Sequence, residues 1–243
     1  MLENKQSVFS AFKPTTLIFF GLILGILVVS TIGFGIMLVK GNDNSEKTSQ
    51  KIEVKNNQPS AQVPTGVKKE ITISDADHIL GDLNAPIKIV EYSDYQCPYC
   101  SRHHPTLQQI IQEYGNQIAW VYKHFPLDTI HQNARPAAEA SECVADQLGD
   151  EGFWNFTDAM FQNQSRLGNS YYEEVASSLG VNLQEFKDCV SSRKFKDKVE
   201  ADYQEGLSLG VTGTPGNFIN GIEVKGAVPF ETLKQIIDSQ LNN

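Results

Sequence analysis

The sequence predicts an α/β domain that carries an inserted group of helices and follows a single transmembrane helix. Three observations support this prediction: an uncharged apolar run at 14–39, strand-like segments at both ends of the remaining chain, and helical patterns between them. The chain has 243 residues, a formal net charge of −9 and no long basic run. It therefore lacks the charge pattern of a nucleic-acid-binding protein.

The apolar run at 14–39 contains no charged side chain. As a helix it would cover about 37 Å, against roughly 30 Å of membrane hydrocarbon. A cleaved signal peptide would have a shorter apolar core and a small-x-small cleavage site, which residues 40–43 do not offer. A buried helix of a soluble protein is the other alternative. We predict an N-terminal tail at 1–13 and a single-pass membrane anchor at 14–39.

Residues 40–69 are polar, with only scattered apolar side chains, and cannot bury a core. We expect a flexible linker there, which would span about 30 Å between its ends. The folded domain is predicted at 70–243, and residues 71–74 at its start are interpreted as a short edge strand.

Apolar runs predict the sheet of this domain. Strands at 87–92 and 117–125 flank a helix that begins at Pro98 and ends before Gly115, which predicts a parallel pair with a crossover helix. The turn Asn220-Gly221 between two apolar runs predicts a hairpin, and a helix at 230–241 closes the chain. The insertion at 133–209 shows helical patterns at 134–148, 151–163, 171–179, 183–191 and 194–209.

Two cysteines lie where the first strand passes into the helix, in the segment Cys97-Pro98-Tyr99-Cys100. Cys97 would cap the helix, whose positive end stabilises a thiolate, and Cys100 would lie one turn later, where it can attack a mixed disulfide at Cys97. A zinc site that includes His103 or His104 and an inert surface disulfide are the alternatives. Ligands at this spacing on one helix do not easily close a tetrahedron, so we favour thiol–disulfide exchange.

Three motifs resemble the DsbA-like thioredoxin-fold family of oxidoreductases: VEYSDYQCPYC at 90–100, HFPL at 124–127 and GVTGTPG at 210–216. The resemblance runs from about residue 73 to 241. It implies a thioredoxin-like fold with an inserted helical subdomain and a protein thiol:disulfide oxidoreductase. One departure is Thr157, where many relatives carry a histidine.

The resemblance also implies a cis peptide bond between Thr214 and Pro215 beside the dithiol, which would leave the Thr214 main chain free to pair with a substrate strand. An ordinary trans proline is the alternative. Glu91 is interpreted, with the same support, as a partly buried acid under Cys100 that relays protons. It would otherwise face solvent, and Asp94 is a second candidate that better fits a turn-capping role.

The remaining cysteines, Cys143 and Cys189, lie on separate predicted helices. In an oxidising compartment two remaining cysteines are expected to pair. The bond would close a loop of about 46 residues and contribute about 4 kcal/mol in the chain-entropy model. Two free thiols and a catalytic relay pair are the alternatives. We predict a structural disulfide.

These features together predict disulfide exchange with extracytoplasmic proteins, most simply as a disulfide-forming oxidase, because secreted chains need disulfides to fold. A reductase or isomerase shares the same parts, and a non-enzymatic peptide-binding or chaperone module is a further alternative. We expect neither a cofactor nor a metal. Electrons would pass to a redox partner protein, for which a membrane-embedded protein is a candidate. The expected location is the cell membrane, with the catalytic domain on the extracytoplasmic side.

Overall fold

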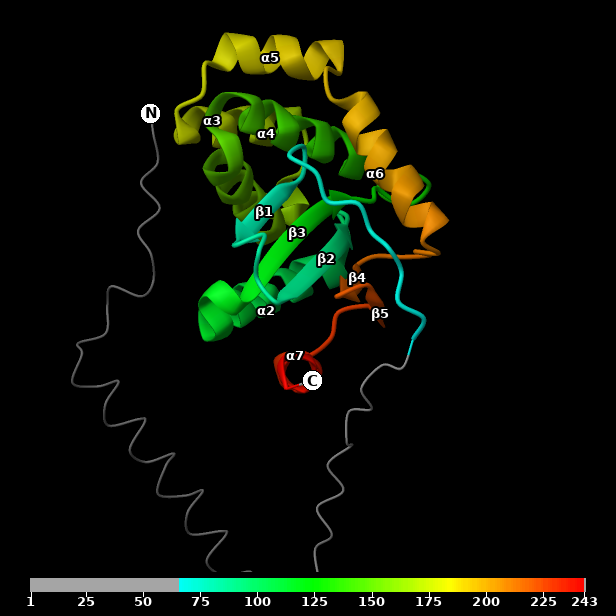
Figure 1. Cartoon of the computed structure of the whole chain (residues 1–243). Helices are drawn as coiled ribbons and strands as arrows, with labels where there is room; N and C mark the ends of the chain where they lie inside the picture. The colour runs from blue at the N-terminus through cyan, green and yellow to red at the C-terminus, as the bar shows by residue number, and fades with distance from the viewer. Residues whose placement is uncertain (1–65, 243) are drawn as a thin grey trace, which may run out of the picture. The chain divides into compact units, whose positions relative to one another are not determined.

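A mixed sheet of five strands forms the centre of the part of the chain that the computed structural model describes, residues 66–242 (Figure 1). Its order is β1-β3-β2-β4-β5, where β2 and β3 are parallel and the other neighbours antiparallel. The predicted parallel pair and the hairpin of β4 and β5 are confirmed. The strands are β1 (His78–Gly81), β2 (Ile87–Ser93), β3 (Ile118–His124), β4 (Gly216–Ile219) and β5 (Ile222–Lys225).

The predicted tail at 1–13, the anchor at 14–39 and the linker up to residue 65 lie outside the described residues. Within 66–242, none of the helices combines the length and the apolar character that crossing a membrane requires.

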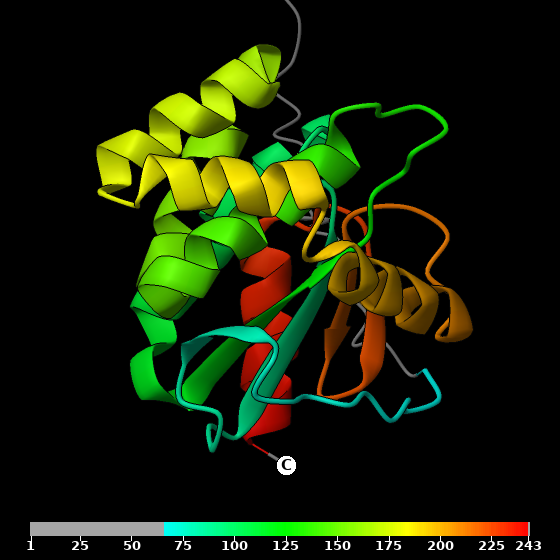
Figure 2. The ribbon, with the colours of Figure 1, turned by 90° about the horizontal axis from the view of Figure 1, so that it is seen from above.

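The two central strands are buried on both faces, as expected for parallel strands between layers of helices. On one face, α2 (Pro98–Tyr114) and α7 (Phe230–Leu241) pack against the sheet together with the start of the insertion. On the other face lie α6 (Lys196–Ser208) and the extended segment 66–73 (Figure 2). The short 3-10 helix η2 (Gly115–Gln117) connects α2 to β3.

The insertion between β3 and β4 is helical throughout, as predicted. It comprises α3 (Ala134–Gln162), η3 (Gln164–Arg166), α4 (Asn169–Leu179), α5 (Leu183–Ser192) and α6. The patterns at 134–148 and 151–163 form one element that is interrupted at Gly149, where φ is 65°. Glycine adopts this left-handed conformation without the steric cost that a Cβ imposes, so the predicted break is present as a kink.

The predicted strand at 71–74 is wrong, because residues 66–77 form no strand. They cross the sheet as an extended segment: the Lys69 N–H donates to the Gly221 carbonyl at 2.8 Å, and Ile71 and Ile73 pack on the apolar cluster around Phe218. The first strand is instead β1, which the sequence analysis did not predict and which pairs antiparallel with β3. Its short, partly polar sequence HILG carries little of the alternation that marks a strand.

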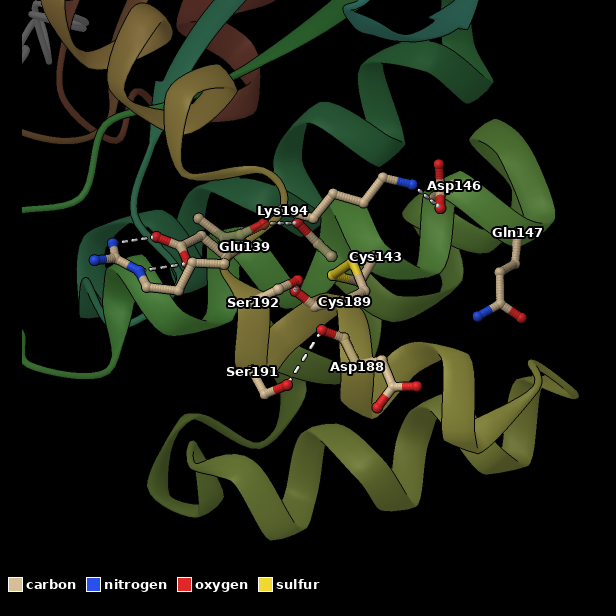
Figure 3. Close-up of a disulfide and its surroundings, with 12 residues drawn as sticks. Glu139, Cys143, Asp146, Gln147, Asp188, Cys189, Ser191, Ser192 and Lys194 are labelled. Carbon is tan, nitrogen blue, oxygen red and sulfur yellow. Dashed lines mark hydrogen bonds and ion pairs between the residues drawn. A yellow bond between two sulfur atoms is a disulfide. The ribbon is translucent and has the colours of Figure 1, made fainter.

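A disulfide joins Cys143 of α3 to Cys189 of α5, the pair expected from the sequence (Figure 3). Two ion pairs flank it: Arg193 donates to Glu139 at 3.0 Å, and Lys194 to Asp146 at 2.6 Å. Both cysteines are buried. The bond holds α5 against α3 at the outer side of the insertion.

Candidate active site

The dithiol lies at the start of α2, where the chain leaves β2. Cys97 is the N-cap residue with an extended backbone, and Pro98 occupies the first helical turn, where its missing N–H costs no hydrogen bond. The Cys97 N–H donates to the Asp94 carbonyl at 3.0 Å, which closes the turn before the helix. The predicted position of Cys97 at the positive end of a helix is therefore confirmed.

The two sulfurs have opposite electrostatic surroundings. A hydrogen bond from the Cys100 thiol is the main cause that lowers the pKa of Cys97 to about 5, and the side chain of Thr214 and the N–H groups of Cys100 and Tyr99 lower it further. Burial raises the pKa of Cys100 well above its ordinary value. Cys97 keeps 4% of its surface exposed and Cys100 none. Near neutral pH the reduced pair thus consists of a Cys97 thiolate and a Cys100 thiol.

The loop before β4 lies beside Cys97. The Thr214–Pro215 peptide bond is cis, and the Cys97 sulfur lies 3.4 Å from the Thr214 carbonyl oxygen. Next to this contact is an open pocket of about 310 Å³, lined by Tyr99, residues 211–216, Glu223, Lys225 and Gly226. Tyr99 is 55% exposed at its mouth.

Glu91 is completely buried in β2, which excludes the alternative of a solvent-facing carboxylate. Its carboxylate accepts hydrogen bonds from Ser93 Oγ at 2.8 Å and Trp120 Nε1 at 3.2 Å. Burial outweighs these bonds and raises the pKa of Glu91 to about 7, and the negative charge of Cys97 acts in the same direction. The charge of Glu91 in turn raises the pKa of Cys100. Glu91 and Cys100 are thus electrostatically coupled, and both side chains are fully buried.

The other polar candidates have structural partners. Asp94 accepts from the backbone N–H groups of Gln96 at 2.7 Å and Leu127 at 2.9 Å, which is the turn-capping role. His103 Nε2 lies 3.1 Å from Asn217 Oδ1, and burial lowers the pKa of His103 to about 4, so the imidazole is neutral.

Thr157 and His104 connect α3 to the core of the site. Thr157 Oγ1 lies 2.7 Å from the hydroxyl of Tyr95, and both side chains are buried. His104 Nε2 lies 2.6 Å from Asp158. In residues 66–242, no cluster of three or more histidine, cysteine, aspartate or glutamate side chains is arranged to hold a metal ion.

A contact between the insertion and the dithiol was not predicted from the sequence. Gln164 Nε2 donates to the carbonyl oxygens of Tyr95 at 2.8 Å and Cys97 at 2.9 Å. Ser101 Oγ donates to the Phe161 carbonyl at 2.9 Å one turn farther along α2. The insertion therefore positions the turn that carries Cys97. No local pattern predicts a contact between residues 67 positions apart.

A family model described as thioredoxin matches residues 74–239. The chain belongs to the thioredoxin family. Within this family it is a DsbA-like thiol:disulfide oxidoreductase, because the Cys97–Cys100 pair and the helical insertion are both present in a fold that DsbA structures share.

Solved structures of DsbA-like proteins superpose on most of the described residues. Wolbachia pipientis alpha-DsbA1 is 25% identical with a TM-score of 0.62, over 71% of this chain and 94% of that one. Pseudomonas aeruginosa DsbA2 is 25% identical with a TM-score of 0.56, over 70% and 96%. Bacillus subtilis BdbD in its oxidised form is similar in fold, at 22% identity and a TM-score of 0.65, over 73% and 99%.

Some curated relatives are much longer proteins. The Na(+)/H(+) antiporter NhaA 1 of Salinispora arenicola is 32% identical over 165 residues, which are 68% of this chain and 25% of the antiporter. NhaA 1 of Mycolicibacterium vanbaalenii is 33% identical over 166 residues, 67% and 26% of the two chains. The match thus spans about a quarter of these relatives, and the transport in their names describes those proteins.

Proposed function

We propose that this protein is a disulfide-forming oxidase that acts on cysteine-containing client proteins. The observation that carries the proposal is the stabilised Cys97 thiolate, with a pKa of about 5. A stabilised thiolate favours the reduced form of the pair, so the disulfide form is a stronger oxidant.

In this function the Cys97–Cys100 disulfide oxidises a client dithiol. A client thiolate attacks Cys97, a mixed disulfide forms, and Cys100 leaves as a thiolate that takes a proton from Glu91. The second client thiol then displaces Cys97, whose low pKa makes it a good leaving group. The Thr214 carbonyl, 3.4 Å from the Cys97 sulfur, would pair with an extended client segment.

We further propose that residues 14–39 anchor this domain on the extracytoplasmic side of the cell membrane. The long uncharged run and the polar linker support the anchor. The Cys143–Cys189 disulfide fits an oxidising compartment. A redox partner protein, with a membrane-embedded one as a candidate, would reoxidise the dithiol. Protease treatment of intact cells or spheroplasts should degrade the domain, and protection from protease would overturn this location.

The reduction potential of the Cys97–Cys100 couple tests the oxidase. The full chain is equilibrated with glutathione buffers, and the reduced fraction is counted by alkylation and mass. An oxidase requires a potential of about −120 to −180 mV, whereas a value near −270 mV would identify a reductase. A Cys97→Ser variant is the control, because it abolishes the couple.

A further inference from the structure

Glu91 has no contact of its own with solvent. Its side chain and that of Cys100 are both 0% exposed. The titratable groups that face Glu91 are the thiols of Cys97 and Cys100 on α2 and the phenol of Tyr122 on β3, and the neighbouring strand β4 places the uncharged Asn217 opposite it. If Glu91 exchanges a proton with Cys100, as the proposed function requires, that proton needs a way to solvent.

The pairing of β2 with β3 aligns polar side chains on the face that α2 and α3 cover. Glu91 lies opposite Tyr122, and Ser93 opposite His124. The Ser93 hydroxyl donates to Glu91 at 2.8 Å. The Tyr122 ring stacks on that of Tyr95 with centroids 5.6 Å apart, and its centroid lies 5.3 Å from that of His124. Buried polar groups therefore extend from Glu91 to the end of β3.

From His124 a continuous set of hydrogen bonds leads to the surface. His124 Nε2 lies 2.9 Å from one oxygen of Glu142, and His78 Nε2 lies 3.1 Å from the other. His78 Nδ1 lies 2.8 Å from Asp150. The Asp150 side chain is 53% exposed, so this end of the set meets solvent between β1 and α3.

Two atoms between these inner and outer parts have no hydrogen-bond partner although they are buried: the hydroxyl of Tyr122 and Nδ1 of His124. Both can donate and accept a proton, and their rings are in contact. Buried polar atoms are normally paired, either with protein groups or with an ordered water. These two atoms come from the two side chains that lie between Ser93 and Glu142, and their hydrogen-bonding capacity is unused.

We propose that Glu91 exchanges protons with solvent through Tyr122 and His124. This proton route consists of Glu91, Ser93, Tyr122, His124, Glu142, His78 and Asp150. It rests on the proposed role of Glu91 and adds the path by which that acid is recharged. The pKa of Glu91, raised to about 7, suits a group that must both lose and regain a proton near neutral pH.

The proton balance is simple in the oxidising direction. The client thiolate forms an S–S bond to Cys97, the Cys97–Cys100 bond breaks, and its electron pair leaves on Cys100. Glu91 gives its proton to the Cys100 thiolate and becomes a carboxylate. A proton from solvent then moves inward along the route to restore the acid. The second client thiolate then attacks the mixed disulfide and releases the Cys97 thiolate. The client dithiol is oxidised to a disulfide, the enzyme disulfide is reduced, and both client protons go to solvent.

The test uses the full chain and follows its oxidation by oxidised glutathione with tryptophan fluorescence, in H₂O and in D₂O. The first phase, attack by Cys97, depends on glutathione concentration. The second phase, attack by Cys100 within the mixed disulfide, does not, and it requires the Cys100 proton to leave through Glu91. Tyr122→Phe removes only the unpartnered hydroxyl. It should slow the second phase about ten-fold and enlarge its solvent isotope effect, while the first phase keeps its rate.

Tyr92→Phe is the matched control. Tyr92 follows Glu91 in β2 and lies on the opposite face of the sheet, where its hydroxyl donates to Glu205 at 2.9 Å. The substitution removes this hydroxyl. This variant should lower the melting temperature and leave both phases unchanged. Tyr122→Phe should melt no lower than the wild type, because it loses no hydrogen bond. If Tyr122→Phe slows the second phase without lowering the melting temperature, Tyr122 acts in proton transfer and not in stabilising the fold.

His78→Gln interrupts the outer part of the route far from the dithiol and should also slow the second phase. The route is overturned if either Tyr122→Phe or His78→Gln leaves that phase at the wild-type rate. Glu91→Gln distinguishes this result from failure of the proposed function. A slow second phase in Glu91→Gln alone keeps Glu91 as the relay acid and rejects the route, whereas a normal second phase in Glu91→Gln rejects the relay acid itself.

Discussion

The side-chain amide of Gln164 lies 2.9 Å from the carbonyl oxygen of Cys97, so the helical insertion holds the residue that carries the reactive sulfur. The same amide donates to Tyr95 at 2.8 Å. Both carbonyls belong to the turn that leads into α2, and the Cys97 carbonyl also accepts the first helical hydrogen bond, from the Ser101 N–H at 3.1 Å. The insertion can therefore influence the pKa of Cys97 as well as pack against the helix that carries the dithiol.

Replacing Gln164 by glutamate should raise the pKa of Cys97. The new carboxylate repels both carbonyl oxygens and adds a negative charge near the thiolate, and we expect an increase of about one pH unit. Thiolate absorbance in the ultraviolet, followed against pH, measures the change. Gln147→Glu is the control, because Gln147 also bridges two segments, donating to the Asn182 carbonyl at 3.3 Å, but belongs to the same helix as Cys143 of the structural disulfide (Figure 3). Equal Cys97 titrations in the two variants would contradict a positioning role for Gln164.

Brief alkylation of the reduced full chain should label Cys97 before Cys100. Only the thiolate reacts, and the pKa of Cys97 is lowered to about 5 whereas burial raises that of Cys100. The rate should increase with pH up to about 6 and then level off. In Cys100→Ala the main hydrogen bond to the thiolate is lost, so the inflection should move to higher pH. Mass mapping identifies the labelled residue, and first labelling of Cys100 would reverse the assignment of the nucleophile.

The sequence predicted much of this site because its chemistry is local. Cys97, Pro98 and Cys100 lie within one turn of helix, and the strand before them and the Asn220-Gly221 hairpin carry strong patterns of their own. The contact of Gln164 with Cys97 depends instead on how the insertion folds back on α2. That packing leaves no periodic signal in the chain.

The wrong predictions near residue 70 have the same physical origin. The segment 71–74 has the apolar alternation of an edge strand, but those side chains fill the cluster under Phe218 without pairing to a strand. The strand β1 is held by its pairing with β3 and by His78, whose partners Glu142 and Asp150 come from α3. Tertiary contacts outweighed local propensity at both positions.

Removing the disulfide with Cys143→Ala/Cys189→Ala should lower the free energy of unfolding by about 2–4 kcal/mol. The bond closes a loop over a sequence separation of 46, and the ion pairs beside it are partly exposed and contribute little. Denaturant unfolding measures the loss. The rate of exchange should stay at the wild-type value, because the disulfide joins α3 to α5, whereas the dithiol lies at the start of α2. Lost exchange with unchanged stability would instead indicate a relay between the two cysteine pairs.

Glu142→Gln should flatten the dependence of stability on pH. Burial alone raises the pKa of Glu142, but the hydrogen bonds from His124 and His78 outweigh it and hold that pKa far below its ordinary value. Burial alone lowers the pKa of His78, and the bonds to Glu142 and Asp150 outweigh it and raise it. The wild type therefore gains stability from both groups at once in a limited pH window.

The signs of the two shifts define that window. Glu142 contributes fully above its ordinary pKa of 4.5 and loses its contribution as pH falls through its depressed pKa. His78 contributes fully below its ordinary pKa of 6.5 and loses its contribution as pH rises through its raised pKa. Between pH 4.5 and 6.5 we expect Glu142→Gln to be about 3–5 kcal/mol less stable than the wild type, because two histidines lose a buried partner. This difference should shrink below pH 4.5. Asp150→Asn, at the exposed end, should cost less than about 1 kcal/mol. Urea unfolding across this range measures all three proteins, and parallel curves for Glu142→Gln and the wild type would show that the charge of Glu142 does not stabilise the fold.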